Sequence, residues 1–332
     1  MKKDTDLTTG SPFLLIGAFS LSLVVGNLFQ QMYTFVDTII IGKNAGTLGL
    51  AAVGGTEWLI FLVNGVVIGL VQGFCILLGN SFGEKNEEEF QRYYDRAKKI
   101  CIVLAVSLTL LFLMLSGVLL RLLGTKEEVY DMAREYVNII FLGIPFLVFY
   151  QLFSGALRSR GNSRIPLFAM TASSLCNIVL DILFVNILDF GIAGAALGTI
   201  LSECLVMLVC GYYFYKYSSC SASCASSDSH KKENDGFDDK AITTKLLRLG
   251  IPMALQSVIT SVGGLIVVNR INQYDITFLA GYTAAVKLYG LLEIAASSFG
   301  LAAAAYVSQN YGAGKKSRIR EGVRASLIMG TA

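Results

Sequence analysis

The stretch FLLIGAFSLSLVVGNLFQQMYTFVDTIII (13–41) decides the fold class of this chain. It is longer than the roughly 20 apolar residues that a helix needs to cross a hydrocarbon core about 30 Å thick. A carboxylic acid, Asp37, lies inside it. An ionised carboxylate at mid-membrane costs on the order of 2.5 to 3.5 kcal/mol on insertion scales, so an acid that is retained there indicates a function.

The composition extends this interpretation to the whole chain. Of its 332 residues, 54% are hydrophobic and only 15% are charged, which is too apolar for an ordinary soluble domain. We therefore predict an all-α integral membrane protein. Eight stretches are long enough to span, at 13–41, 48–78, 100–120, 136–157, 166–188, 192–215, 246–269 and 278–305.

A ninth apolar stretch begins at Val323, and the sequence ends at Ala332. About ten apolar residues do not cross a bilayer. We therefore expect the chain to be C-terminally truncated.

Basic residues are distributed unevenly between the two sides that these spans define. One side receives only Lys43, Arg121, Lys126, Arg134 and Arg270, whereas the N-terminus and the other loops carry the remaining Lys and Arg outside the spans. By the positive-inside rule the N-terminus is predicted to be cytoplasmic. We interpret the basic loops as topology signals, with no nucleic acid as partner.

The segment 218–244 is the one clear change of composition, because it is polar and rich in Ser, Asp and Lys. It predicts a flexible cytoplasmic linker between an N-terminal lobe (1–217) and a partial C-terminal lobe (245–332). Cys220, Cys224 and His230 lie in this linker, but their loose spacing is poor for a tetrahedral metal site. No metal is expected.

The sequence after the linker restarts the sequence before it. Ala51-Ala52-Val53 corresponds to Ala284-Ala285-Val286, and GNSFGEK (79–85) resembles SQNYGAGK (308–315), at an offset of roughly 230 residues. A repeat in the same orientation predicts two six-helix bundles related by an axis along the membrane normal. Substrate would be handled between or inside the bundles, and rocking of the bundles would alternate its access to the two sides of the membrane. The second bundle is represented by two helices and the start of a third.

Five motifs carry a resemblance to a known family. NLFQQMYTFVDTIIIGKNAG (27–46), ALRSRGNSRIP (156–166), NIVLDILF (177–184), LGIP (249–252) and SQNYGAGK (308–315) are similar to the multidrug and toxic compound extrusion (MATE) family. The resemblance implies a bacterial plasma-membrane transporter that acts as a monomer. Its family exports organic cations and amphipathic drugs in exchange for protons or sodium, without a cofactor other than the coupling ion and without enzymatic catalysis.

The same resemblance implies a cation-coupling site. Asp37 falls on the acid of the first helix, Asn177 and Asp181 on the Asn-x-x-x-Asp of the fifth, and Thr199 on a hydroxyl that the DinF-type branch has in the sixth. Independently, residues four apart share one helical face, so the Asn177 amide can hydrogen-bond the Asp181 carboxyl or share a cation with it. The alternative is that both aspartates are structural hydrogen bonders between helices.

Further polar residues in the spans are candidates for the substrate cavity. They are Gln30, Gln31, Tyr33, Tyr136, Glu203, Lys287 and Glu293. The glutamines are equally consistent with interhelical hydrogen bonding, and Glu293 with a side chain that extends toward the interface.

The chain also departs from the family pattern. Ser22 stands where the family usually has a proline, and Thr260 where the NorM-type branch has a glutamate. We therefore expect no NorM-type cation site in the C-terminal lobe.

Two other function classes compete with an antiporter. A flippase for lipid-linked sugars would need a basic cavity for phosphate head groups, and the spans contain only Lys287. A membrane enzyme would need catalytic groups, and the only histidine, His230, lies in the linker.

Overall fold

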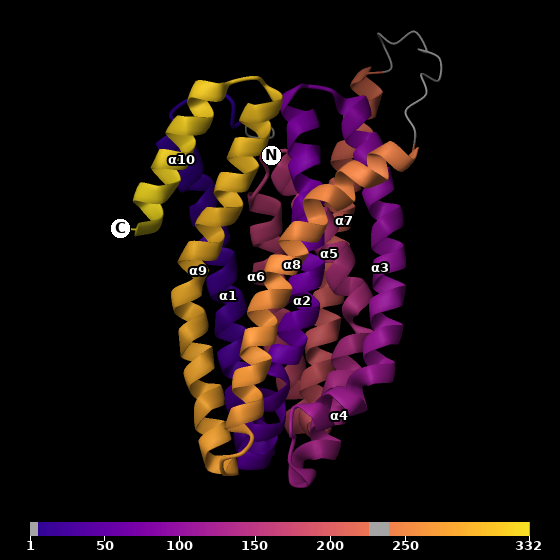
Figure 1. Cartoon of the computed structure of the whole chain (residues 1–332), viewed down its shortest axis with the longest axis vertical. Coiled ribbons are helices and arrows are strands. Elements are labelled where there is room, and N and C mark those ends of the chain that lie inside the picture. The colour runs from indigo at the N-terminus through magenta and orange to yellow at the C-terminus, as the bar shows by residue number, and fades with distance from the viewer. Residues whose placement is uncertain (1–5, 226–238, 332) are drawn as a thin grey trace.

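The computed structural model describes residues 6–225 and 239–331, and within these ranges the ordered elements are all helical (Figure 1). This confirms the predicted all-α class. The elements are α1 (Pro12–Asn44), α2 (Gly46–Gly83), α3 (Glu87–Leu122), α4 (Glu127–Leu142), α5 (Ile144–Ser159), α6 (Arg164–Asp181), the π-helix η1 (Ile182–Ile187), α7 (Gly191–Ala225), α8 (Asp239–Ile271), α9 (Ile276–Gly312) and α10 (Lys316–Thr331).

Long helices run alternately up and down one elongated bundle (Figure 1). The N-terminus, the α2–α3 connection and the α9–α10 connection lie at one end, which we call the N-terminal end. The α1–α2, α3–α4 and α8–α9 connections lie at the opposite end. The basic loops therefore gather at the N-terminal end, as the charge pattern predicts.

Six of these helices are long and apolar enough to cross a membrane, and up to eight spans result if each of two bent helix pairs counts as one. The predicted span 136–157 is such a pair, because α4 and α5 meet at a bend of 43°. Gly143 separates the two helices, and Pro145 near the start of α5 contributes no N–H to continue α4. The second bend, of 40°, lies in α9 between Leu291 and Glu293.

Several helices extend beyond the predicted spans. Asn86 caps α3 by accepting a hydrogen bond from the Glu89 N–H, and three glutamates occupy the first turn, so this helix starts well before residue 100. Helix α7 continues to Ala225 and α8 begins at Asp239, so both ends of the predicted linker (218–244) are helical. Helix α10 begins at Lys316, before the predicted Val323.

Large apolar side chains cover the outside of the bundle. Met114 on α3 is 81% exposed, and Leu14 on α1 and Ile259 on α8 are each 72% exposed. On a soluble protein such a surface would be an association site, whereas in a bilayer it faces lipid tails of the same polarity.

Helix α2 lies at the centre, in contact with α3, α4 and α5 on one side and with α8 and α9 on the other. Gly65, Gly69 and Gly73 form a stripe along its α8-facing side. A Cβ atom added at Gly69 would lie 2.5 Å from the Ala254 Cα, and at Gly73 the Gly250 backbone leaves no space for one. The backbones of α2 and α8 therefore lie in close contact where the two lobes meet, as small residues at a helix interface permit.

Candidate functional site

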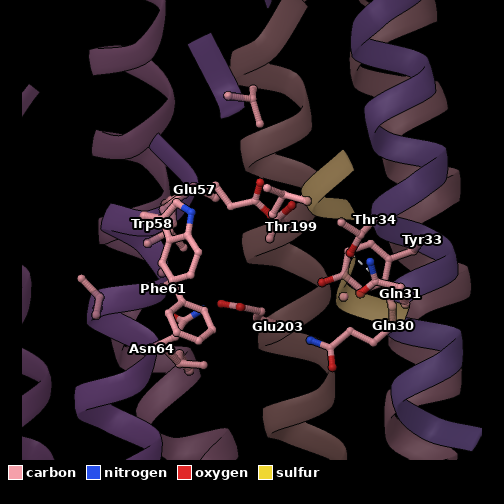
Figure 2. Close-up of a pocket in the computed structure, with 18 of the residues that line it drawn as sticks. Gln30, Gln31, Tyr33, Thr34, Glu57, Trp58, Phe61, Asn64, Thr199 and Glu203 are labelled. Carbon is pink, nitrogen blue, oxygen red and sulfur yellow. Dashed lines mark hydrogen bonds between the residues drawn. The ribbon is translucent and has the colours of Figure 1, made fainter. Parts of the chain in front are cut away.

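A cavity of about 530 Å³ lies between the helices of the two lobes (Figure 2). Its volume falls within the range of small-molecule sites. Side chains of α1 and α2 form part of its wall, and Thr199 and Glu203 of α7 form another part. Helices α4, α5, α8 and α9 complete it.

The cavity is both aromatic and acidic. Tyr33, Trp58, Phe61, Tyr136 and Tyr289 are among its lining residues. The charged side chains that line the described part of the wall are all carboxylates, contributed by Glu57, Glu203 and Glu293. Aromatic faces and carboxylates both attract cations, especially where water is partly displaced.

Three of the four predicted coupling residues lie beside the cavity rather than on its surface, and the fourth, Thr199, lines it. Asp37 on α1 is 8% exposed, and Asn177 and Asp181 on α6 are fully buried. Helix α1 packs against α6, which places the Asp37 charge close enough to Asp181 for the two carboxylates to repel each other. Two neighbouring buried acids favour a state in which a cation or a proton is shared between them.

Hydrogen bonds join Asn177, Asp181 and Thr199. In the amide orientation that satisfies both ends of Asn177, its nitrogen donates to Asp181 Oδ2 at 3.1 Å and its oxygen accepts from the Thr199 backbone N–H at 3.3 Å. Asp181 Oδ1 is buried and accepts no hydrogen bond from the described residues. It packs on Gly198, where a Cβ atom would collide with it.

Thr199 therefore belongs to both regions. It lines the cavity, and its backbone contacts the amide that holds Asp181. Tyr33 and Tyr136 also line the cavity and lie within electrostatic range of Asp37 and Asp181. A positive charge that enters or leaves either region thus changes the electrostatic potential in the other.

The other predicted cavity residues are placed as follows. Gln30 and Gln31 line the cavity from α1, Glu293 lines it from α9, and Thr260 lines it from α8. The side chain of Lys287 lies outside the described part of the structure. Ser22, in place of the family's proline, sits within the continuous helix α1 and donates to the Ala18 carbonyl at 3.2 Å.

Sequence reasoning missed two features of the site. Glu57 and Trp58 are not among the predicted site residues, yet they lie about 18 Å along α2, on the cavity wall. The Trp58 indole donates to the Tyr282 hydroxyl at 3.1 Å, so it bridges the two lobes. The π-helix η1 begins directly after Asp181, and such wide turns occur frequently at functional sites.

The described residues contain no group of three or more His, Cys, Asp and Glu side chains that could hold a metal ion. The side chains of Cys220 and Cys224, and the whole of His230, lie outside the described residues.

Comparisons with known proteins identify one family and several similar transport and resistance proteins. The family model MatE matches residues 23–183 and 252–332. The chain is 27% identical to "Probable multidrug resistance protein YoeA" of Bacillus subtilis over 93% of this chain and 66% of that protein. It is 26% identical to the "FAD transporter" of Shewanella oneidensis over 94% of this chain and 69% of that protein.

A solved structure of an outward-facing multidrug resistance MATE family transporter of the MOP superfamily has the same fold. Its TM-score is 0.83 at 23% identity, over 99% of this chain and 71% of that one. The chain therefore spans about two thirds of the length of the relatives that it matches.

Proposed function

We propose, from the premise that the chain belongs to the MatE family of membrane transporters, that it is part of a secondary active multidrug efflux antiporter. It exports cationic or amphipathic compounds in exchange for protons or sodium, by access that alternates between the two sides of the membrane. The N-terminus is cytoplasmic, the transporter acts as a monomer in the bacterial plasma membrane, and its coupling residues follow the DinF-type pattern.

The observation that carries this proposal is the pairing of an acidic aromatic cavity with a separate buried acid site. The cavity offers Glu57, Glu203 and Glu293 to a cationic substrate. The buried site offers Asp181 Oδ1, which accepts no hydrogen bond from the described residues, to the coupling ion. Loading one site with positive charge disfavours positive charge in the other, and this is the electrostatic requirement for exchange.

The charge of the cavity disfavours phosphate-bearing substrates. A flippase for lipid-linked oligosaccharides moves a phosphate group, and FAD, the substrate in the name of one relative, also carries phosphates. Three carboxylates on the described wall would repel such groups. Organic cations fit the same wall.

The test is ethidium efflux from membrane vesicles with either an imposed pH gradient or an imposed sodium gradient. We expect one of the two gradients to drive uphill efflux, and the effective one identifies the coupling ion. A matched control is Asp131→Asn, an exposed acid on α4. Efflux that responds to neither gradient, or only to added ATP, would contradict the proposal.

A further inference from the structure

The two copies of the repeated motif meet each other at the N-terminal end of the bundle. Gly79, the first residue of GNSFGEK (79–85), packs on Ser308, the first residue of SQNYGAGK (308–315). The Asn80 amide, oriented to satisfy its neighbours, donates to the Ser308 carbonyl at 2.9 Å. The transport function leaves this pair of motifs unexplained.

Their contact is reciprocal. Gly83 leaves no space for a Cβ atom against the Gln309 carbonyl, and Gly312 leaves none against the Asn80 carbonyl. Asn80 is the motif equivalent of Gln309, and Gly83 is that of Gly312. Each motif thus contacts its counterpart through the same positions, as across a two-fold axis. We call this contact between α2 and α9 the seam.

Gln309 also joins the seam to the chain's own N-terminal segment. Its side-chain oxygen accepts a hydrogen bond from the Leu7 N–H at 3.1 Å, and its side-chain nitrogen donates to the Ser159 carbonyl at 2.8 Å. Gln309 is fully buried. One side chain of α9 therefore holds both the end of α5 and the residues that precede α1.

Three more side chains bind the same segment through its carbonyl groups. Asn310 donates to the Leu7 carbonyl at 3.1 Å, Lys315 to the Thr8 carbonyl at 2.8 Å and Arg318 to the Gly10 carbonyl at 2.8 Å. Arg318 also donates to Asn310 Oδ1 at 3.0 Å, so these groups form one network. Hydrogen bonds from charged donors are the stronger ones in such a network.

Apolar contacts and charge hold the segment as well. The Leu7 side chain is 1% exposed, in a cluster with Ile16 and Phe19 of α1 and Tyr306 of α9. Burial alone would raise the pKa of the preceding Asp6, but hydrogen bonds from Thr8 and the positive charges of Lys315 and Lys85 lower it below its ordinary value. Polar and apolar contacts thus bind residues 6–10 to α9 and to the start of α10.

We propose that residues 6–10 form a latch that holds the seam between α2 and α9 closed and must leave Gln309, Asn310, Lys315 and Arg318 before this end of the bundle opens. The proposed opening of this end rests on the proposed function, because it assumes alternating access. The proposed role of the latch in holding the seam closed does not depend on that function, because it concerns only contacts in the structure described. Since the latch is continuous with α1, which carries Asp37, movement of that helix is transmitted directly to the C-terminal lobe.

The experiment measures how fast a membrane-impermeant maleimide modifies Ser308→Cys in open membrane fragments. Ser308 is 4% exposed, and the substitution replaces one oxygen by sulfur. Cys75, Cys176, Cys204, Cys220 and Cys224 are first changed to Ser, since the first three are only partly buried. Modification is expected to be slow in this parent, and about tenfold faster after Arg318→Gln, which removes charged hydrogen bonds from the latch.

The matched control is Arg320→Gln, an exposed basic residue two positions further on. It should leave the rate of the parent unchanged. Equal rates in Arg318→Gln and Arg320→Gln, or fast modification already in the parent, would overturn the latch. If Arg318→Gln does not fold, deletion of residues 2–8 removes the bound segment from the other side and should give the same acceleration.

A second measurement tests release. Thr8→Cys and Lys315→Cys, joined by a cleavable bifunctional thiol reagent, should stop gradient-driven efflux, and cleavage should restore it. A monofunctional reagent is the control. Undiminished efflux by the cross-linked protein would overturn release, whereas absence of efflux before cross-linking would contradict the proposed function and leave the maleimide result standing.

Discussion

The acids of this transporter form two groups that meet at Thr199 and differ in burial. Asp37 and Asp181 are enclosed by α1, α6 and α7, whereas Glu203 and Glu293 line an open cavity. A buried carboxylate binds a small ion because only a small ion reaches it, and a cavity carboxylate binds whatever fits the cavity. In the proposed function the same functional group therefore has two different roles because of its surroundings.

Removing the charge of Asp37 should have the largest effect on efflux among the changes to the two groups of acids. Asp37→Asn should lower gradient-driven efflux by at least about a hundredfold, because the coupling ion loses a ligand while the size of the side chain is kept. Efflux in vesicles measures the loss, and protease protection of the helices should remain that of the parent. Undiminished efflux would mean that the coupling ion binds elsewhere.

The second test asks whether Asp37 and Asp181 act as one unit. Asp181→Asn alone should reduce efflux strongly, and the Asp37→Asn/Asp181→Asn double variant should be hardly worse than either single one. The four vesicle preparations are compared at equal protein content. Losses that multiply in the double variant would assign the two acids independent roles.

A third test disturbs the buried group without changing an acid. Gly198→Ala places a methyl group against Asp181 Oδ1, so the carboxylate must shift, and we expect about a tenfold loss of efflux. Gly263→Ala on α8 is the matched control, because no atom lies near its added Cβ. A parent-like Gly198→Ala protein would show that the position of Asp181 is not critical.

The smallest effect should come from the cavity. Glu203→Gln is expected to raise the KM for ethidium about fivefold at unchanged kcat, since a partly exposed charge pair contributes little. The concentration dependence of initial efflux rates measures this, with Glu128→Gln at the exposed start of α4 as control. A fall in kcat with unchanged KM would place Glu203 with the buried acids.

Much of this arrangement follows from local sequence patterns. Apolar length indicates the spans, and the spacing of Asn177 and Asp181 predicts that they share one helical face, because both depend on residues within one helix. The repeat likewise predicts which motifs are equivalent. These inferences need no knowledge of which helices are neighbours.

Other features depend on contacts between distant segments. The place of Trp58 follows from where α2 begins and from Tyr282 on the other lobe, about 220 residues away in the chain. The attachment of Leu7 to Gln309 and Asn310 joins the two ends of the chain. No periodicity within a helix encodes such pairings, so sequence reasoning did not find them.

The glycine stripe of α2 has a mechanical consequence. Its glycines recur every four residues, a rise of about 6 Å, and the opposing face of α8 offers Gly250, Ala254 and Ser257 at similar intervals. A slip of one helical turn would bring Gly65 opposite Ala254 and Gly69 opposite Gly250, so these small residues alone do not select one register. Further along the same contact the Trp58 indole of α2 packs on Gly264 of α8, where a Cβ atom would lie 2.0 Å from the ring. One bulky side chain therefore fixes the register that the glycine stripe leaves open.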